Sequence, residues 1–228
     1  MLNSLEITGR ARTHVVQYTE PRFAAQPEVA LAFQDMQKAA AQDGFRIEPF
    51  SSFRDYKTQL RIWNNKFSGK RPLYTQEGIP RERSELSNEQ IVRHILDWSG
   101  LPGASRHHWG TEIDVIDRAA VTADYTPQLL PQESNPGGVF HPLHVWLNER
   151  IGEHGFFRPY KRYQGGMYEE PWHLSYAPAS VAAVEVVSID LLTEVTLEAD
   201  ILGKDIVLAL IPEIYETHVM NYVAPDDQ

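Results

Sequence analysis

Cysteine is absent from all 228 residues of the chain. Its absence excludes disulfide bonds, thiolate catalysis and metal sites built on sulfur ligands. It does not distinguish the cytoplasm from the periplasm. The candidate chemistry accordingly rests on histidine, carboxylate and arginine side chains.

The chain also lacks an excess of basic residues. With 21 Lys and Arg against 31 Asp and Glu, its formal net charge is −10. This balance argues against a nucleic-acid partner, because phosphate contacts need a basic face. An anionic substrate is still compatible with it, since a few local arginines can override the global charge.

Long apolar runs are missing as well. The most apolar late stretch, 181–195, is interrupted by Glu185, Asp190 and Glu194, so we expect no membrane span. Residues 1–10 lack the basic region and the apolar core of a signal peptide. We therefore expect a cytoplasmic protein, with the periplasm as the alternative if a signal peptide has been removed.

The spacing of apolar residues predicts an α+β fold. Helical spacing and end signals predict helices over 27–43, 55–67, 87–99 and 142–154. Apolar–polar alternation favours strands over 45–50, 112–117 and 170–176. The aperiodic segments between these elements read as two long loops, 68–86 and 118–141.

Together these elements indicate one catalytic domain over residues 1–178. We expect a small, mainly antiparallel sheet with helices on one side and a cleft across the other. From about residue 179 the pattern predicts two or three more helices, separated by Gly203 and Pro212. These form a C-terminal helical extension, 179–228, that packs onto the domain.

Two short stretches carry the residues that point to metal chemistry. The first contains His107 and Asp114, and the second contains Glu170 and His173. Two imidazoles and one carboxylate are a typical ligand set for a zinc ion that keeps a fourth position open. A further carboxylate beside them suits a zinc peptidase, which needs a base to take the proton from water.

Each stretch alone has an ordinary structural explanation. A His and an Asp seven residues apart rarely bind metal, and Trp172-His173 reads equally well as a buried pair on a strand. Pro171 breaks the regular strand and lets Glu170 approach the same centre as His173, although residues three apart normally face opposite sides. On that strand, Trp172, Leu174 and Tyr176 are expected to face the core.

Neighbouring residues complete the candidate site. Gly110 can supply the turn that folds His107 back over Asp114, and His108 is interpreted as structural or as a support for the neighbouring metal-binding residues. Arg54, in Ser52-Phe53-Arg54, lies at the junction of the first predicted strand and the second helix, five residues before Gln59. An arginine there can hold a carboxylate or a developing oxyanion.

Together, the three motifs resemble those of a known family. Their order is Arg54 to Gln59, then Ser-x-His-x-x-Gly-x-x-x-Asp, then Glu-x-Trp-His. It comprises the zinc D-alanyl-D-alanine carboxypeptidases of the vancomycin-resistance type. The D-alanyl-D-alanine dipeptidases, phage L-alanyl-D-glutamate endopeptidases, lysostaphin-type enzymes and hedgehog-type domains belong with them. The resemblance covers roughly residues 26–178.

The resemblance implies a role for each matching residue. One zinc ion would bind His107, Asp114 and His173, with Glu170 as the general base. Arg54 would stabilise the transition state, Gln59 would line the substrate site, and Ser105 would bind the substrate or orient the site. Two departures adjoin these residues: Glu112 stands where the family often has a small residue, and Leu174-Ser175-Tyr176 replaces an Arg-Tyr pattern.

The expected activity is hydrolysis of the terminal D-alanyl-D-alanine bond of a peptidoglycan stem peptide. The alternatives on the same site are an L,D-carboxypeptidase, a D-alanyl-D-alanine dipeptidase and an L-alanyl-D-glutamate endopeptidase, or a metal-binding module without turnover. If Arg54 serves the scissile carbonyl, a loop must supply a second cation for the terminal carboxylate. The candidates are Arg71, Arg81, Arg83 and Arg118.

Overall fold

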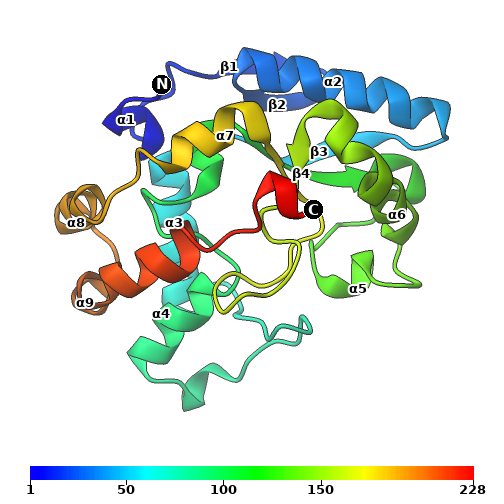
Figure 1. The fold of residues 1–228 in the computed structure, drawn as a ribbon. Coiled ribbons are helices and arrows are strands. Elements are labelled where there is room, and N and C mark those ends of the chain that lie inside the picture. Colours follow the sequence, from blue (N-terminus) through cyan, green and yellow to red (C-terminus); the bar gives the residue numbers. More distant parts are fainter.

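The computed structural model describes residues 1–228. Its strands form a four-stranded antiparallel sheet, in the order β3-β4-β6-β5, and a separate β1-β2 hairpin (Figure 1). The strands are β1 (Val16–Thr19), β2 (Arg22–Ala25), β3 (Ile47–Ser51), β4 (Glu112–Asp117), β5 (Phe156–Phe157) and β6 (His173–Tyr176). The helices are α1 (Ser4–Ile7), α2 (Pro27–Gln42), α3 (Tyr56–Phe67), α4 (Asn88–Leu96), α5 (Pro131–Ser134), α6 (His141–Arg150), α7 (Ala177–Val184), α8 (Ile189–Glu198) and α9 (Lys204–Ile214).

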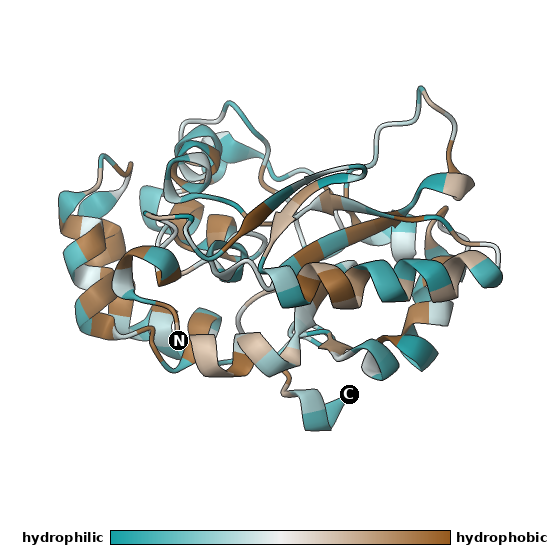
Figure 2. Cartoon of the chain, turned by 90° about the horizontal axis from the view of Figure 1, so that it is seen from above, coloured by the Kyte–Doolittle hydropathy of each residue, from teal (hydrophilic) through white to brown (hydrophobic).

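One face of the sheet is covered by α2 and α6, as expected. Ile113, Val115 and Leu174 point from β4 and β6 into an apolar cluster with residues of both helices, such as Phe33 and Leu147. Helix α2 presents one apolar side to the sheet, built from residues such as Val29, Phe33 and Met36. Hydrophobic and hydrophilic residues alternate along the helices of the molecule (Figure 2). This layer holds the sheet in place and leaves its other face for polar residues.

A second apolar cluster lies beside the sheet. It joins Trp63 of α3 and Ile95 of α4 to the C-terminal helices through Val184, Leu192 and Ile211. Figure 1 shows α3, α4, α8 and α9 gathered on one side of the molecule. The segment after residue 178 is therefore helical and shares a core with α3 and α4, and a domain boundary at 178 stays a prediction.

Local sequence signals explain where the helices begin. Pro27 occupies the first turn of α2, and the Asp55 carboxylate accepts a hydrogen bond from the Thr58 N–H at the start of α3. At the start of α4, Ser87 and Gln90 form the predicted capping box. None of the helices combines the length and apolarity that crossing a membrane requires.

Several elements differ from the expectation. The β1-β2 hairpin, helix α1 and strand β5 were not predicted, and α5 interrupts the segment 118–141 that reads as a loop. Pro212, which was expected to separate two helices, lies inside α9. In addition, β6 begins only at His173, because Pro171 and Trp172 form a turn. The α+β class and the antiparallel sheet are confirmed.

Candidate active site

Strands β4 and β6 bring Asp114 and His173 together on the polar face of the sheet. The two residues are direct partners in the antiparallel register, and Glu112 is the partner of Ser175 two positions away. Because side chains alternate along a strand, these four side chains share one face. All four are buried, so a buried polar cluster lies on the sheet opposite the apolar layer.

His107 reaches the cluster from the turn that precedes β4. This turn, Arg106–Trp109, ends at Gly110 with φ 68°, where a Cβ would lie 2.4 Å from the Val15 side chain. Glycine is therefore required there, both for the left-handed backbone and for space. His107 donates from Nδ1 to the Ser52 carbonyl at 2.9 Å, which directs its Nε2 toward Asp114 at 3.3 Å.

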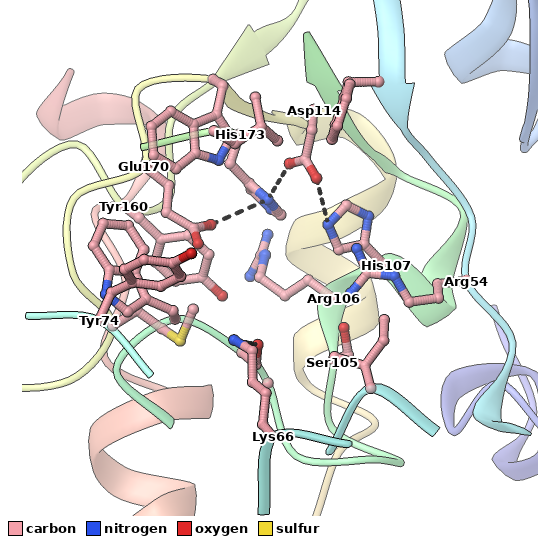
Figure 3. A pocket seen from close by; sticks show the side chains of 18 of the residues that line it. Arg54, Lys66, Tyr74, Ser105, Arg106, His107, Asp114, Tyr160, Glu170 and His173 are labelled. Atoms are coloured by element: carbon pink, nitrogen blue, oxygen red, sulfur yellow. Dashed lines mark hydrogen bonds and ion pairs between the residues drawn. The ribbon is translucent and has the colours of Figure 1, made fainter. Parts of the chain in front are cut away.

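The ligand atoms of His107, Asp114 and His173 lie within 4.8 Å of one another (Figure 3). With Nδ1 protonated, the Nε2 lone pair of His107 faces the Asp114 carboxylate. Two electron-rich atoms so close repel each other, and a cation bound between them would remove that repulsion. Two nitrogens and one oxygen are also a donor set that suits zinc. The three residues thus fit a divalent metal ion.

His173 is held by a carboxylate on each side of its ring. Nδ1 donates to Asp114 at 2.9 Å and Nε2 donates to Glu112 at 2.8 Å. Although burial disfavours the charged imidazole, these hydrogen bonds and charges raise the pKa of His173 to about 10. The position therefore favours a positive charge, which a metal ion would supply after displacing the Nδ1 proton.

Glu170 approaches the cluster through a tight turn. The His173 N–H donates to the Glu170 carbonyl at 3.0 Å, with Pro171 inside the turn. The Glu170 carboxylate consequently lies 3.6 Å from His173 Nδ1, and burial raises its pKa to about 7. The same turn corrects the expectation for Trp172, which lies on the cavity wall instead of in the core under the sheet.

Arg54 lies on the wall of the same cavity and is held from behind. Its guanidinium donates to the Gln59 side-chain oxygen at 2.7 Å and to the Ser51 hydroxyl at 2.9 Å. Its carbonyl accepts a hydrogen bond from His108 at 2.6 Å, in agreement with a structural His108. Gln59 is fully buried and does not line the cavity, so its expected contact with substrate is corrected to support of Arg54.

Glu112 is the most informative departure from the family pattern. It is completely buried, accepts hydrogen bonds from His173 and from Ser175 at 2.8 Å each, and lies 3.3 Å from the Arg106 guanidinium. Burial would raise its pKa, but Arg106 and His173 hold it at about 2. Glu112 is thus a charged support for His173, as often seen behind metal-bound histidines.

The cluster opens into a cavity of about 530 Å³. Both long loops border it, 68–86 through Tyr74 and 118–141 through Leu129. Ser105 lines it, and so do further residues that were not assigned to the site from the sequence, among them Lys66, Tyr160 and Trp172. Lys66 had a detectable signal, since it follows Gln59 by seven residues and shares its side of α3.

Known proteins are similar to this chain in sequence. Two Haemophilus influenzae proteins, both described as uncharacterized, are 37% identical over 98 residues and 32% identical over 122 residues. These matches cover 42% and 53% of this chain and 67% and 93% of the two relatives.

Among solved structures, VanYB in complex with D-alanine-D-alanine has a TM-score of 0.55 at 20% identity, over 78% of this chain and 83% of that one. A Zn(II) complex of a mutant of the vancomycin-resistance D,D-pentapeptidase VanY has a TM-score of 0.54 at 16% identity, over 95% and 89%. The fold is therefore shared with these proteins.

The family model of the D-alanyl-D-alanine carboxypeptidases, VanY, matches residues 22–179. That range contains the sheet, the cluster of His107, Asp114 and His173, and Glu170 on its turn. Since the match extends over most of the chain and over every element that builds the site, this protein belongs to the VanY family of D-alanyl-D-alanine carboxypeptidases.

Proposed function

We propose that the protein is a zinc-dependent carboxypeptidase that removes the terminal D-alanine from peptidoglycan stem peptides. The observation that carries the proposal is the buried group of His107, Asp114 and His173 with the Glu170 carboxylate 3.6 Å from His173. The D-alanine-D-alanine complex of VanYB and the Zn(II) complex of VanY support the substrate and the metal. The cavity of about 530 Å³ is large enough for the end of a peptide.

His107, Asp114 and His173 would hold one zinc ion. When bound, zinc polarises a carbonyl group and lowers the pKa of a bound water toward about 7. Glu170 would take the proton of the attacking water and deliver it to the leaving amine. Arg54 meets the negative charge that develops on the scissile carbonyl oxygen, because its guanidinium is held in one orientation by Ser51 and Gln59. Ser105, on the cavity wall, is placed to contact the peptide.

The test is a turnover assay on a muropeptide pentapeptide that ends in D-alanyl-D-alanine, with products identified by mass spectrometry. We expect release of a single D-alanine, loss of activity with a chelator and recovery with added zinc. Free D-alanyl-D-alanine and a tetrapeptide stem are tested in parallel. Hydrolysis of the free dipeptide alone would instead assign the dipeptidase, removal of the last residue of the tetrapeptide the L,D-carboxypeptidase, and cleavage inside the stem the endopeptidase. No turnover of any of these peptides would leave a metal-binding module.

Glu170→Ala distinguishes loss of the general base from loss of a metal ligand. We expect at least about a hundredfold loss of kcat, as for a missing general base, with folding and zinc content unchanged. The neighbouring exposed Glu169 gives the matched control, and Glu169→Ala should behave as the wild type. Nearly normal turnover in Glu170→Ala would move the role of the base to another carboxylate, with Glu112 the next candidate.

A further inference from the structure

Lys66 lies in the last turn of α3 and reaches into the active-site cavity. In Figure 3 it enters from the side opposite Asp114 and His173. Ile62, one turn earlier on the same side of the helix, also lines the cavity, so α3 forms the wall that faces the metal-binding cluster. A lysine at this place is within the space that a substrate must occupy.

The ammonium group of Lys66 is incompletely paired. It donates to the Ser99 hydroxyl at 2.7 Å, whereas an ammonium group carries three donors. Lys66 forms none of the ion pairs in the structure; the nearest negative influences are the Glu170 and Asp97 carboxylates, opposed by Arg54 and Arg71. Burial lowers the pKa of Lys66 to about 8, in line with a charge that lacks a close counterion.

Three arginines also line the cavity: Arg54, Arg71 and Arg106. Arg106 is paired with Glu112, and Arg54 is held by Gln59 and Ser51. Of the four loop arginines considered from the sequence, Arg71 is exposed and lines the cavity, whereas the other three do not line it. Lys66 differs from these arginines because it is more buried than Arg71 and, unlike Arg106, has no carboxylate within ion-pair distance.

We propose that Lys66, together with Ser99, binds the free C-terminal carboxylate of the peptide substrate. This inference rests on the proposed function and names the cation that it needs. A carboxylate placed there would accept hydrogen bonds from the unused N–H groups of Lys66. Its negative charge would neutralise the Lys66 ammonium group inside the cavity. Arg54 would then be free to serve the scissile carbonyl. The site would discriminate a terminal acid from an amide, which carries no charge.

The experiment compares a peptide ending in D-alanyl-D-alanine with its C-terminal amide. The wild type should prefer the acid in kcat/KM by roughly 10- to 100-fold, the range of one charge-assisted hydrogen bond. Lys66→Met should reduce that ratio to within about threefold by slowing the acid only, with zinc content unchanged. Lys66→Arg, which keeps the charge, should retain most of the preference.

Lys70→Met is the matched control, because Lys70 is exposed just beyond α3 and does not line the cavity. It should keep the wild-type ratio. If Lys66→Met does not fold, Lys66→Gln provides the same comparison with a polar side chain. An unchanged acid-to-amide ratio in a folded Lys66 variant, or loss of zinc from it, would overturn the proposal.

A binding measurement separates this inference from the proposed function. Calorimetric titration of zinc-loaded Glu170→Ala protein with D-alanyl-D-alanine and with its amide needs no turnover. We expect the acid to bind roughly 10- to 100-fold more tightly, and the difference to disappear when Lys66→Met is added. A catalytically silent wild type would defeat the proposed function, whereas equal binding of acid and amide would defeat the role of Lys66.

Discussion

Strands β4 and β6 are buried on both faces of the sheet, and the two faces have opposite chemistry. On β6, Leu174 is 0% exposed and packs against the apolar layer, while its neighbour His173 is 3% exposed and lies among carboxylates. On β4, Ile113 and Asp114 divide in the same way. Burial alone therefore does not identify a core position.

The difference lies in what balances the cost of desolvation. An apolar side chain gains free energy on leaving water, whereas a buried ionised group loses it unless charges and hydrogen bonds compensate. His173, Glu112 and Asp114 compensate one another. Burial of the apolar face stabilises the fold. A stable sheet in turn holds the polar side chains of the other face in one arrangement. Substitutions of neighbouring residues can separate these two contributions.

His173→Ala should have the largest effect, and it should fall on the polar face alone. Removing the imidazole deletes a proposed zinc ligand and leaves Asp114 and Glu112 as neighbouring buried carboxylates. We expect zinc binding and peptidase activity to fall below detection, because a three-ligand site rarely survives with two. Zinc measured by atomic absorption after dialysis checks this. Stoichiometric zinc in a folded His173→Ala protein would mean that the metal binds elsewhere.

Leu174→Ala, one residue later, should act on stability. Deleting a fully buried leucine costs about 2–5 kcal/mol of the free energy of unfolding, because it leaves a cavity. Urea denaturation measures this change. Since Leu174 points away from the cluster, zinc content and kcat per folded molecule should stay within about threefold of the wild type. A loss of zinc as large as that of His173→Ala would break the division between the faces.

Glu112→Gln should have a smaller effect on the same ligand. The amide still reaches His173 but loses the charge that faces Arg106. We expect zinc affinity to fall about 10- to 100-fold, the usual penalty for losing an outer partner of a metal-bound histidine. Competition with a chromogenic chelator measures it, and Ser175→Ala should cost less. If Glu112→Gln binds zinc with the affinity of the wild type, the charge of Glu112 does not support the metal site.

The sequence predicted three strands of the sheet and the grouping of the candidate metal ligands, because both depend on local patterns. Strand alternation places Asp114 on one face, and Gly110 allows the turn that returns His107 to it. The β1-β2 hairpin escaped prediction because its strands are short and β1 is largely exposed, so neither shows a clear alternation. Short exposed strands depend on their partners for stability.

Trp172 and Gln59 lie elsewhere than the sequence predicted, because their positions depend on geometry that residue periodicity does not describe. Trp172 was assigned to the core by strand alternation, but the turn from Glu170 to His173 rotates it onto the cavity wall, where it stacks on Trp98 at 6.0 Å. Gln59 resembles a substrate residue in sequence, yet α3 buries it behind Arg54. Such positions follow from tertiary packing, which overrides a local pattern.

The smallest expected effect concerns Lys66, whose charge has no carboxylate partner, unlike the paired charges of the polar face. Its pKa of about 8 lies below the ordinary 10.5, so between these values the unfolded chain binds more protons than the folded one. The free energy of unfolding of the wild type should therefore rise with pH from about 8 to 10.5. Below pH 8, Lys66→Met should be more stable than the wild type by about 1–2 kcal/mol, because the gain from removing the charge is offset by the lost hydrogen bond to Ser99.

Urea denaturation of chelator-treated wild type and Lys66→Met at pH 7, 9 and 10.5 measures this difference. The advantage of the variant should shrink as pH rises, since deprotonation removes the unpaired charge from the wild type as well. Glu170 and Asp97 favour the Lys66 charge, and Arg54 and Arg71 oppose it, so their own substitutions should shift the window in opposite directions. A variant that is less stable than the wild type at pH 7, with no change in the difference up to pH 10.5, would mean that Lys66 is already neutralised within the fold and has no unused charge to offer a ligand.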